Sequence, residues 1–83
     1  LRVLKMNNEK LYIQAFVDAF EIDESEVSDL EYESIENWDS VGHMVLMAGL
    51  EEAFDIMLEM EDIIDFSGFS RGKELLAKYD ILV

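Results

Sequence analysis

Apolar residues recur at helical spacing along most of this chain, and no proline interrupts them. The 83 residues include four glycines, and the strict alternation that marks a strand is scarce. A chain of this length forms one small domain and buries only about 60–65% of its unfolded surface. Because 51% of its residues are hydrophobic, it should fold rather than stay disordered. We therefore predict one all-α domain over residues 1–83.

The pattern predicts a four-helix bundle with a long first loop and a short third helix. The expected elements are a first helix capped by Asn7 or Asn8 and reaching Phe20, a second from Asp39–Ser40 to about Phe54, an extended piece from Ile56 to Leu58, a short helix around Glu61–Asp65, and a last helix capped by Ser67 or Ser70 that includes Tyr79. Met6 would be the natural start, with residues 1–5 a remnant of cloning.

Residues 21–39 form the long connection between the first two helices. It is acidic, and its apolar residues Val27, Leu30, Ile35 and Trp38 have irregular spacing. Long loops of this kind are uncommon unless they serve a function or are anchored. We expect this loop to be pinned to the core at several points.

The charge is strongly negative and unevenly distributed. The net charge is −14, and no lysine or arginine occurs between positions 11 and 70, where 17 of the 20 acids lie. Such a field repels nucleic acid and anionic membranes, and it attracts basic partner surfaces in a salt-dependent way. No apolar run approaches the roughly 18–20 residues that span a bilayer. We expect neither nucleic acid nor membrane as a partner. The alternative is that the acidity only keeps a small protein soluble.

The sequence offers no set of catalytic residues. Ser40 and His43 lie three positions apart on the second helix, but no third orienting group or glycine-rich oxyanion site accompanies them. The adjacent carboxylates of Glu51 and Glu52 diverge on a helix and make a poor acid–base pair. We therefore predict that the protein is not an enzyme.

Metal binding is also not indicated. The sequence has no cysteine, which excludes a thiolate metal site and a disulfide and is compatible with a reducing compartment. An EF-hand starting at Asp23 fails at Val27, Ser28 and Ser34. We expect no metal site.

The second helix has more apolar surface than a small core can cover. At about 100° per residue, one group of residues lies within roughly 60° of the Leu50 direction and faces the core. It holds Leu46, His43, Met47, Leu50, Ala53 and Phe54. A second arc, between about 160° and 260°, is apolar at its start and acidic at its end. It holds Val41, Met44, Val45, Ala48, Glu51, Glu52 and Asp55. Either loop 21–39 covers this second arc, through Ile35 or Trp38, or a partner docks on it.

Ser40 lies at the start of this helix, next to the second arc. Helix N-termini carry unpaired N–H groups and the positive end of the dipole, so they favour an attached or bound phosphate. Aspartate and serine are also the common capping residues, so Asp39 and Ser40 are equally compatible with plain capping.

The segment "WDSVGHMVLMAGLEEAF" resembles the acyl carrier proteins, which are small acidic four-helix bundles with a long first loop. The "DSV" signature, the "LEEAF" that follows it and the acidity carry the resemblance, which extends loosely over most of the chain. It implies a 4′-phosphopantetheine arm, derived from coenzyme A, attached covalently to Ser40 with Asp39 as the flanking motif residue. The arm's thiol would hold an acyl or aminoacyl group as a thioester for delivery to enzymes of a biosynthetic pathway.

The resemblance also implies partners and a location. A phosphopantetheinyl transferase would modify Ser40, and acyl- or aminoacyl-loading and acyl-transfer enzymes with basic patches would dock on the second arc. A monomer in the cytoplasm is expected. Gly42 and Val45 stand where carriers of fatty acid synthesis have acids, so the chain looks more like a free-standing carrier of a specialised pathway. An aminoacyl or peptidyl carrier, and an acidic helical adaptor without a prosthetic group, remain the alternatives.

Overall fold

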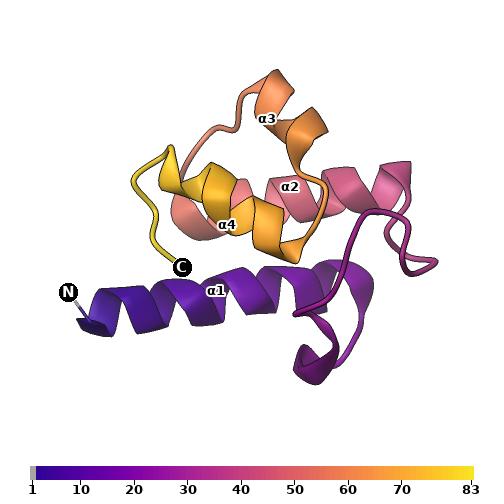
Figure 1. The fold of residues 1–83 in the computed structure, drawn as a ribbon, viewed down its shortest axis with the longest axis horizontal. Coiled ribbons are helices and arrows are strands. Elements are labelled where there is room, and N and C mark those ends of the chain that lie inside the picture. Colours follow the sequence, from indigo (N-terminus) through magenta and orange to yellow (C-terminus); the bar gives the residue numbers. More distant parts are fainter. Residues whose placement is uncertain (1) are drawn as a thin grey trace.

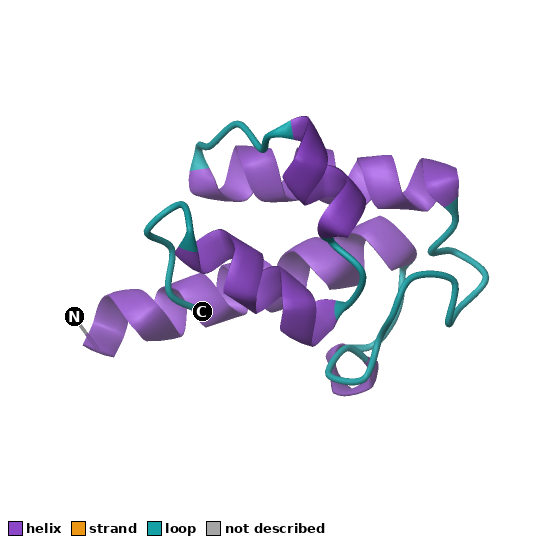
Figure 2. Ribbon diagram, turned by 45° about the horizontal axis from the view of Figure 1, so that its top comes forward, coloured by secondary structure: helices purple, strands orange, loops and turns teal. Residues whose placement is uncertain are grey.

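The computed structural model describes residues 2–83, with side chains from Asn7 onward. All regular elements in this range are helices, and the one β-bridge is isolated. The elements are α1 (Arg2–Phe20), the 3₁₀ turn η1 (Glu24–Glu26), α2 (Ser40–Phe54), α3 (Met60–Asp65) and α4 (Phe69–Ala77). In Figures 1 and 2, α4 lies along α1, and the short α3 crosses α2. The predicted all-α bundle with a long first loop and a short third helix is confirmed.

Two predicted helix starts are wrong. The first helix begins at Arg2, so Asn7 and Asn8 lie inside it, and Asn8 donates a hydrogen bond to Leu82 O near the C-terminus. The last helix is preceded by Gly68, and neither Ser67 nor Ser70 caps it. Gly68 instead forms a bridge with Glu31, because the α3–α4 connection pairs there with the long loop. The proposed cloning remnant, residues 1–5, lies outside the described side chains.

Aromatic residues form the centre of the core. Tyr12, Phe16 and Phe20 recur every fourth residue on α1, which places them on one face of the helix. Phe16 packs edge-on against Trp38 at 5.7 Å and against Phe69 at 5.1 Å between ring centroids. The buried residues of α2 and α4 that complete the core are Leu46, Met47, Leu50, Leu75 and Leu76. The core arc predicted for α2 is therefore the buried face.

Helix α4 approaches α1 very closely at one glycine. A Cβ at Gly72 would lie 2.2 Å from both the Tyr12 hydroxyl oxygen and Phe66 Cζ. The Tyr12 hydroxyl donates a 2.6 Å hydrogen bond to Phe69 O at the start of α4. Burial raises the pKa of Tyr12, so this hydroxyl keeps its proton and stays a donor.

The long loop is anchored as predicted. Val27, Leu30 and Trp38 are buried, and Ile35 is half-buried against the core. Ile35 and Trp38, the two loop residues that could have covered the second arc of α2, therefore lie beside and in the core. No helix in residues 2–83 has both the length and the apolar character required to cross a membrane.

Candidate functional site

Ser40 is the first residue of α2, and its side chain is exposed. Asp39 is the N-cap, and its Oδ1 accepts a 2.8 Å hydrogen bond from the Gly42 amide. The first-turn amides of Ser40 and Val41 have no acceptor within the helix, as is general for helix N-termini. The capping role therefore belongs to Asp39, which leaves the Ser40 hydroxyl exposed beside a weakly positive helix end.

Gly42 allows the long loop to rest on the first turn of α2. A Cβ at this position would lie 1.9 Å from Asn37 O. Asn37 is itself held by a 2.8 Å hydrogen bond from its side-chain amide to Phe20 O at the end of α1. Position 42 therefore requires glycine, because any side chain there would displace the loop that leads to Ser40.

Tyr32 of the long loop stands beside Ser40. Its hydroxyl oxygen lies 3.3 Å from Ser40 Oγ. Its ring meets the rings of His43 and Trp38 edge-on, with centroids 5.5 Å and 6.4 Å away. The loop therefore brings a second hydroxyl to the predicted attachment site.

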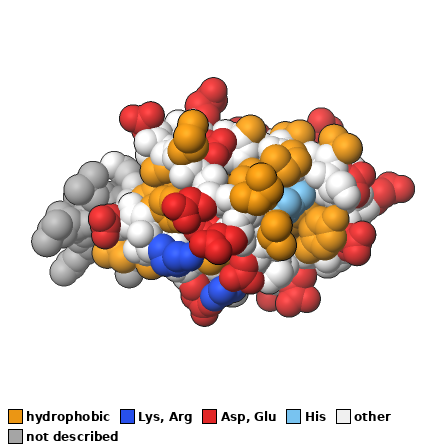
Figure 3. Space-filling view, turned by 90° about the horizontal axis from the view of Figure 1, so that it is seen from above, with side chains coloured by type: hydrophobic (Ala, Val, Ile, Leu, Met, Phe, Trp, Pro, Cys, Tyr) orange, Lys and Arg blue, Asp and Glu red, His pale blue; other side chains and the backbone are white. Residues whose placement is uncertain are grey.

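Ser40 lines an apolar groove of about 480 Å³, which we call the α2–α3 groove. Its walls include Tyr32, His43, Met44, Met60, Ile63 and Ile64. Met60 and Ile64 are about three-quarters exposed, at 75% and 76%. Figure 3 shows hydrophobic side chains gathered around the single histidine on this face. A groove of this size and lining is within the range that binds small organic groups.

His43, which lines the groove, joins α2 to α3 through a hydrogen bond. Trp38 Nε1–H donates to His43 Nδ1 at 2.9 Å, which makes Nδ1 the acceptor. The proton is therefore on Nε2, which lies 2.7 Å from Ile63 O and donates to it. Both ring nitrogens are used, so His43 is a hydrogen-bonded histidine with no lone pair left for general base chemistry.

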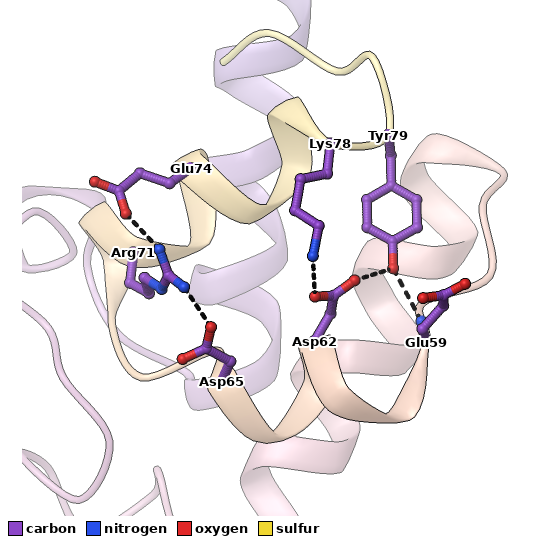
Figure 4. Close-up of polar contacts among 7 residues, drawn as sticks. All are labelled: Glu59, Asp62, Asp65, Arg71, Glu74, Lys78 and Tyr79. Carbon is purple, nitrogen blue, oxygen red and sulfur yellow. Dashed lines mark hydrogen bonds and ion pairs between the residues drawn. The ribbon is translucent and has the colours of Figure 1, made fainter.

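Helix α3 is held from its other side by polar contacts with α4 and the residues that follow it (Figure 4). The buried Asp62 carboxylate accepts hydrogen bonds from Lys78 Nζ at 2.6 Å and from the Tyr79 hydroxyl at 2.5 Å. The Tyr79 hydroxyl also accepts a hydrogen bond from the Glu59 amide at 2.9 Å. The bonds from Lys78 and Tyr79 hold the pKa of Asp62 below its usual value, and the bond to Asp62 raises the pKa of Lys78.

A second ion-pair cluster lies at the C-terminal end of α3. Arg71 contacts Asp65 of α3 and Glu74 of α4, as Figure 4 also shows. All three side chains are largely in contact with solvent, so these pairs contribute little to stability.

The apolar residues of the predicted docking arc are all exposed. Val41 is 72% exposed, Met44 54% and Val45 50%, and Ala48 is also on the surface. The interpretation in which loop 21–39 covers this arc is therefore wrong. The arc also divides, because Met44 faces the α2–α3 groove whereas Val45 lines a second groove of about 310 Å³ between α1 and α2.

The three acids of the arc have different surroundings. Glu51 is half-buried, and its Oε2 accepts a 2.9 Å hydrogen bond from the Leu58 amide in the α2–α3 connection. Asp55 is the C-cap of α2 in the left-handed conformation, with a φ of 54°. Glu52 and Asp55 are exposed, so they are the acids of this arc that remain open to a partner.

Sequence reasoning missed the residues from outside α2 that complete the site. These are Tyr32, Met60, Ile63, Ile64 and Ser67. The spacing of Met60 and Ile64, four apart on a short helix, was the available signal for an exposed apolar face. Nothing local predicts that Tyr32 contacts Ser40. Among the residues that the structure describes, no cluster of histidines or acids could hold a metal ion.

Comparison of the chain with protein-family models, with curated proteins and with solved structures gives no match.

Proposed function

We propose that the chain is a carrier protein that holds an acyl or aminoacyl group on a 4′-phosphopantetheine arm attached to Ser40. The observation that carries the proposal is the position of Ser40: an exposed residue at the start of α2, after an aspartate cap and in the lining of an apolar groove. This arrangement agrees with the resemblance of "DSV" and "LEEAF" to acyl carrier proteins.

The residues around Ser40 fit a phosphodiester. The amides of Ser40 and Val41 lie at the positive end of the helix dipole, where an anion is favoured. The Asp39 carboxylate is occupied by the Gly42 amide, which orients it toward the helix. When bound, the arm supplies a thiol that carries the group as a thioester. The residues of the chain position the attachment site and present a docking surface, and none acts as a catalyst.

Partner docking is expected on the exposed start of α2. Val41, Met44 and Val45 offer apolar contacts close to Ser40, and Glu52 and Asp55 offer negative charge farther along. The enzymes in question are a phosphopantetheinyl transferase and acyl- or aminoacyl-transferring enzymes with basic patches. Charge steering speeds such encounters without making the complex tight, which suits a carrier that must leave each partner.

The test is covalent modification. Incubation with coenzyme A and a broad-specificity phosphopantetheinyl transferase should add one phosphopantetheinyl mass, located on Ser40 by fragmentation. Ser40→Ala should fold and stay unmodified. Ser67→Ala, which removes another hydroxyl that lines the same groove, should be modified like the wild type. A wild-type protein that stays at its original mass with several active transferases would contradict the proposal.

The exposed apolar residues also support a second candidate, an acidic helical adaptor without a prosthetic group. Met44, Met60 and Ile64 form an exposed apolar surface whether or not Ser40 is modified. Exposed apolar surface of this kind marks interaction sites. The same mass measurement decides between the candidates, because an adaptor would not accept the arm.

A further inference from the structure

We propose that Tyr32 is a positioning residue for the arm: its hydroxyl donates a hydrogen bond to the phosphodiester on Ser40 and directs the arm along the α2–α3 groove. The inference rests on the proposed function, since it needs a modified Ser40. It concerns a loop residue that lies eight positions before the serine and outside the motif that carries the resemblance.

The backbone of Tyr32 is fixed by contacts distant in sequence. Its amide donates a 2.9 Å hydrogen bond to Ser67 O in the α3–α4 connection. On one side of it, Glu31 forms the bridge with Gly68, and the Phe69 amide donates to Leu30 O at 2.9 Å. These bonds clamp the loop to the start of α4, so the position of Tyr32 does not depend on its side chain.

The Tyr32 ring contacts two aromatic rings of the site. Its edge-on contacts with His43 and Trp38 are nearly perpendicular, at 83° and 84°. The side chain is nevertheless partly open to solvent, with 39% of the residue exposed. Tyr32 thus lines the groove, and its hydroxyl lies beside that of Ser40.

Modification of Ser40 changes which of the two hydroxyl groups, Tyr32 or Ser40, can donate a hydrogen bond. In the unmodified protein either hydroxyl of the 3.3 Å pair can be the donor. Esterification removes the hydrogen from Ser40 Oγ and makes it a bridging ester oxygen, so only Tyr32 can then donate. The negative charge lies on the non-bridging oxygens of the phosphate, and these are the acceptors to which the Tyr32 hydroxyl would donate. A phosphodiester is ionised, and a hydrogen bond to an ionised acceptor is roughly twice as strong as one between neutral groups. Tyr32 is therefore better matched to the modified serine than to the free one.

Such a bond would also give the arm a direction. Tyr32 and Ser40 both line the groove, together with Met44 of α2 and Met60 and Ile64 of α3. An arm held by Tyr32 at Ser40 therefore begins beside apolar side chains instead of in open solvent. The chain would thereby favour a docked arm over a freely swinging one.

The experiment compares wild-type protein with Tyr32→Phe, both loaded with an isotope-labelled arm. This substitution keeps the ring and removes only the hydroxyl. We expect the ³¹P resonance of the phosphodiester to shift and the arm to become more mobile in nuclear relaxation, with the melting temperature unchanged. Tyr79→Phe is the matched control: it removes the hydroxyl that bonds Asp62, so it should lower the melting temperature and leave the ³¹P resonance in place.

The outcomes separate the two proposals. If Ser40 accepts no arm, the carrier function itself fails. If Ser40 is modified but Tyr32→Phe leaves the ³¹P resonance and the arm mobility unchanged, only the role of Tyr32 is overturned. Should Tyr32→Phe unfold, wild-type protein labelled at tyrosine Cζ replaces it. The Tyr32 Cζ resonance must then move when the arm is attached, and an unmoved resonance overturns the role.

Discussion

At the scale of single residues, two glycines of α2 have opposite surroundings although both lie in the same helix. Gly42 has the carbonyl of Asn37 pressed against it, whereas nothing lies within 4 Å of a Cβ built at Gly49. The loop that leads to Ser40 requires a glycine at position 42. Gly49 lies inside the helix, and no described contact requires a glycine there.

These surroundings predict substitutions of opposite sign. Gly42→Ala should lower the free energy of unfolding by about 1–3 kcal/mol, because the added methyl group overpacks the contact with Asn37. Gly49→Ala should raise it by about 0.5–1 kcal/mol, because alanine favours the helix more than glycine does. Denaturant titration followed by circular dichroism measures both. Equal effects of the two substitutions would show that the loop does not rest on Gly42.

A second pair of substitutions distinguishes the buried core from the exposed arc of α2 on which docking is proposed. Leu50 is fully buried, so Leu50→Ala should cost about 2–5 kcal/mol of stability. Met44 is half exposed, so Met44→Ala should cost less than about 1 kcal/mol. If Met44 contacts the transferase, Met44→Ala should also slow modification of Ser40 by about five- to thirtyfold.

Thermal melts and modification rates of the same two variants check this prediction. Leu50→Ala should lose stability, and the fraction that remains folded should be modified at the wild-type rate. A large loss of stability in Met44→Ala, or an unchanged modification rate, would place the docking surface elsewhere.

At the scale of elements, local sequence patterns predicted the helices and the anchoring of the long loop, but they missed two helix starts and the contacts between distant segments. The period of apolar residues predicted α2 and the short α3 within about a residue, because buried faces impose that period. The starts of α1 and α4 were missed because asparagine and serine are tolerated within helices as well as at caps. Ser40 and the exposed arc follow from local sequence. The groove does not follow from local sequence. It depends on contacts such as His43 with Ile63 and Tyr32 with Ser40, which join separate segments of the chain.

Helix α3 depends on a buried carboxylate, which makes its attachment sensitive to acid. The pKa of Asp62 is lowered in the folded protein, chiefly by the bond from Lys78 and then by that from Tyr79. A lowered folded-state pKa contributes stability that is present above the unfolded value and is lost as pH falls through the folded one. We therefore expect Asp62→Asn to be less stable than the wild type at neutral pH.

The pH profile distinguishes this from a general packing defect. The stability difference between wild type and Asp62→Asn should shrink as pH falls below about 3.8, the ordinary pKa of an aspartate side chain. Urea titrations across an acidic pH series provide the measurement. A difference that stays constant across the series would mean that the charge of Asp62 does not hold α3.

At the scale of the whole molecule, the acids are close together compared with the range of their repulsion. The molecule measures 36 × 28 × 19 Å, and it carries a net charge of −14. The Debye length is about 30 Å at 0.01 M salt and about 8 Å at 0.15 M. At low salt each carboxylate is therefore repelled by acids across the molecule, whereas at physiological salt it responds mainly to its neighbours.

This repulsion predicts that the melting temperature rises from low to physiological salt, since a strong net charge destabilises the compact state. The described residues contain no acidic cluster that could hold a metal ion. Magnesium chloride and sodium chloride at equal ionic strength should therefore raise the melting temperature by similar amounts, because both act by screening. Differential scanning calorimetry over both salt series measures the effect. A melting temperature that does not change with sodium chloride would show that self-repulsion is unimportant, and a clear excess with magnesium would reveal a binding site for the ion.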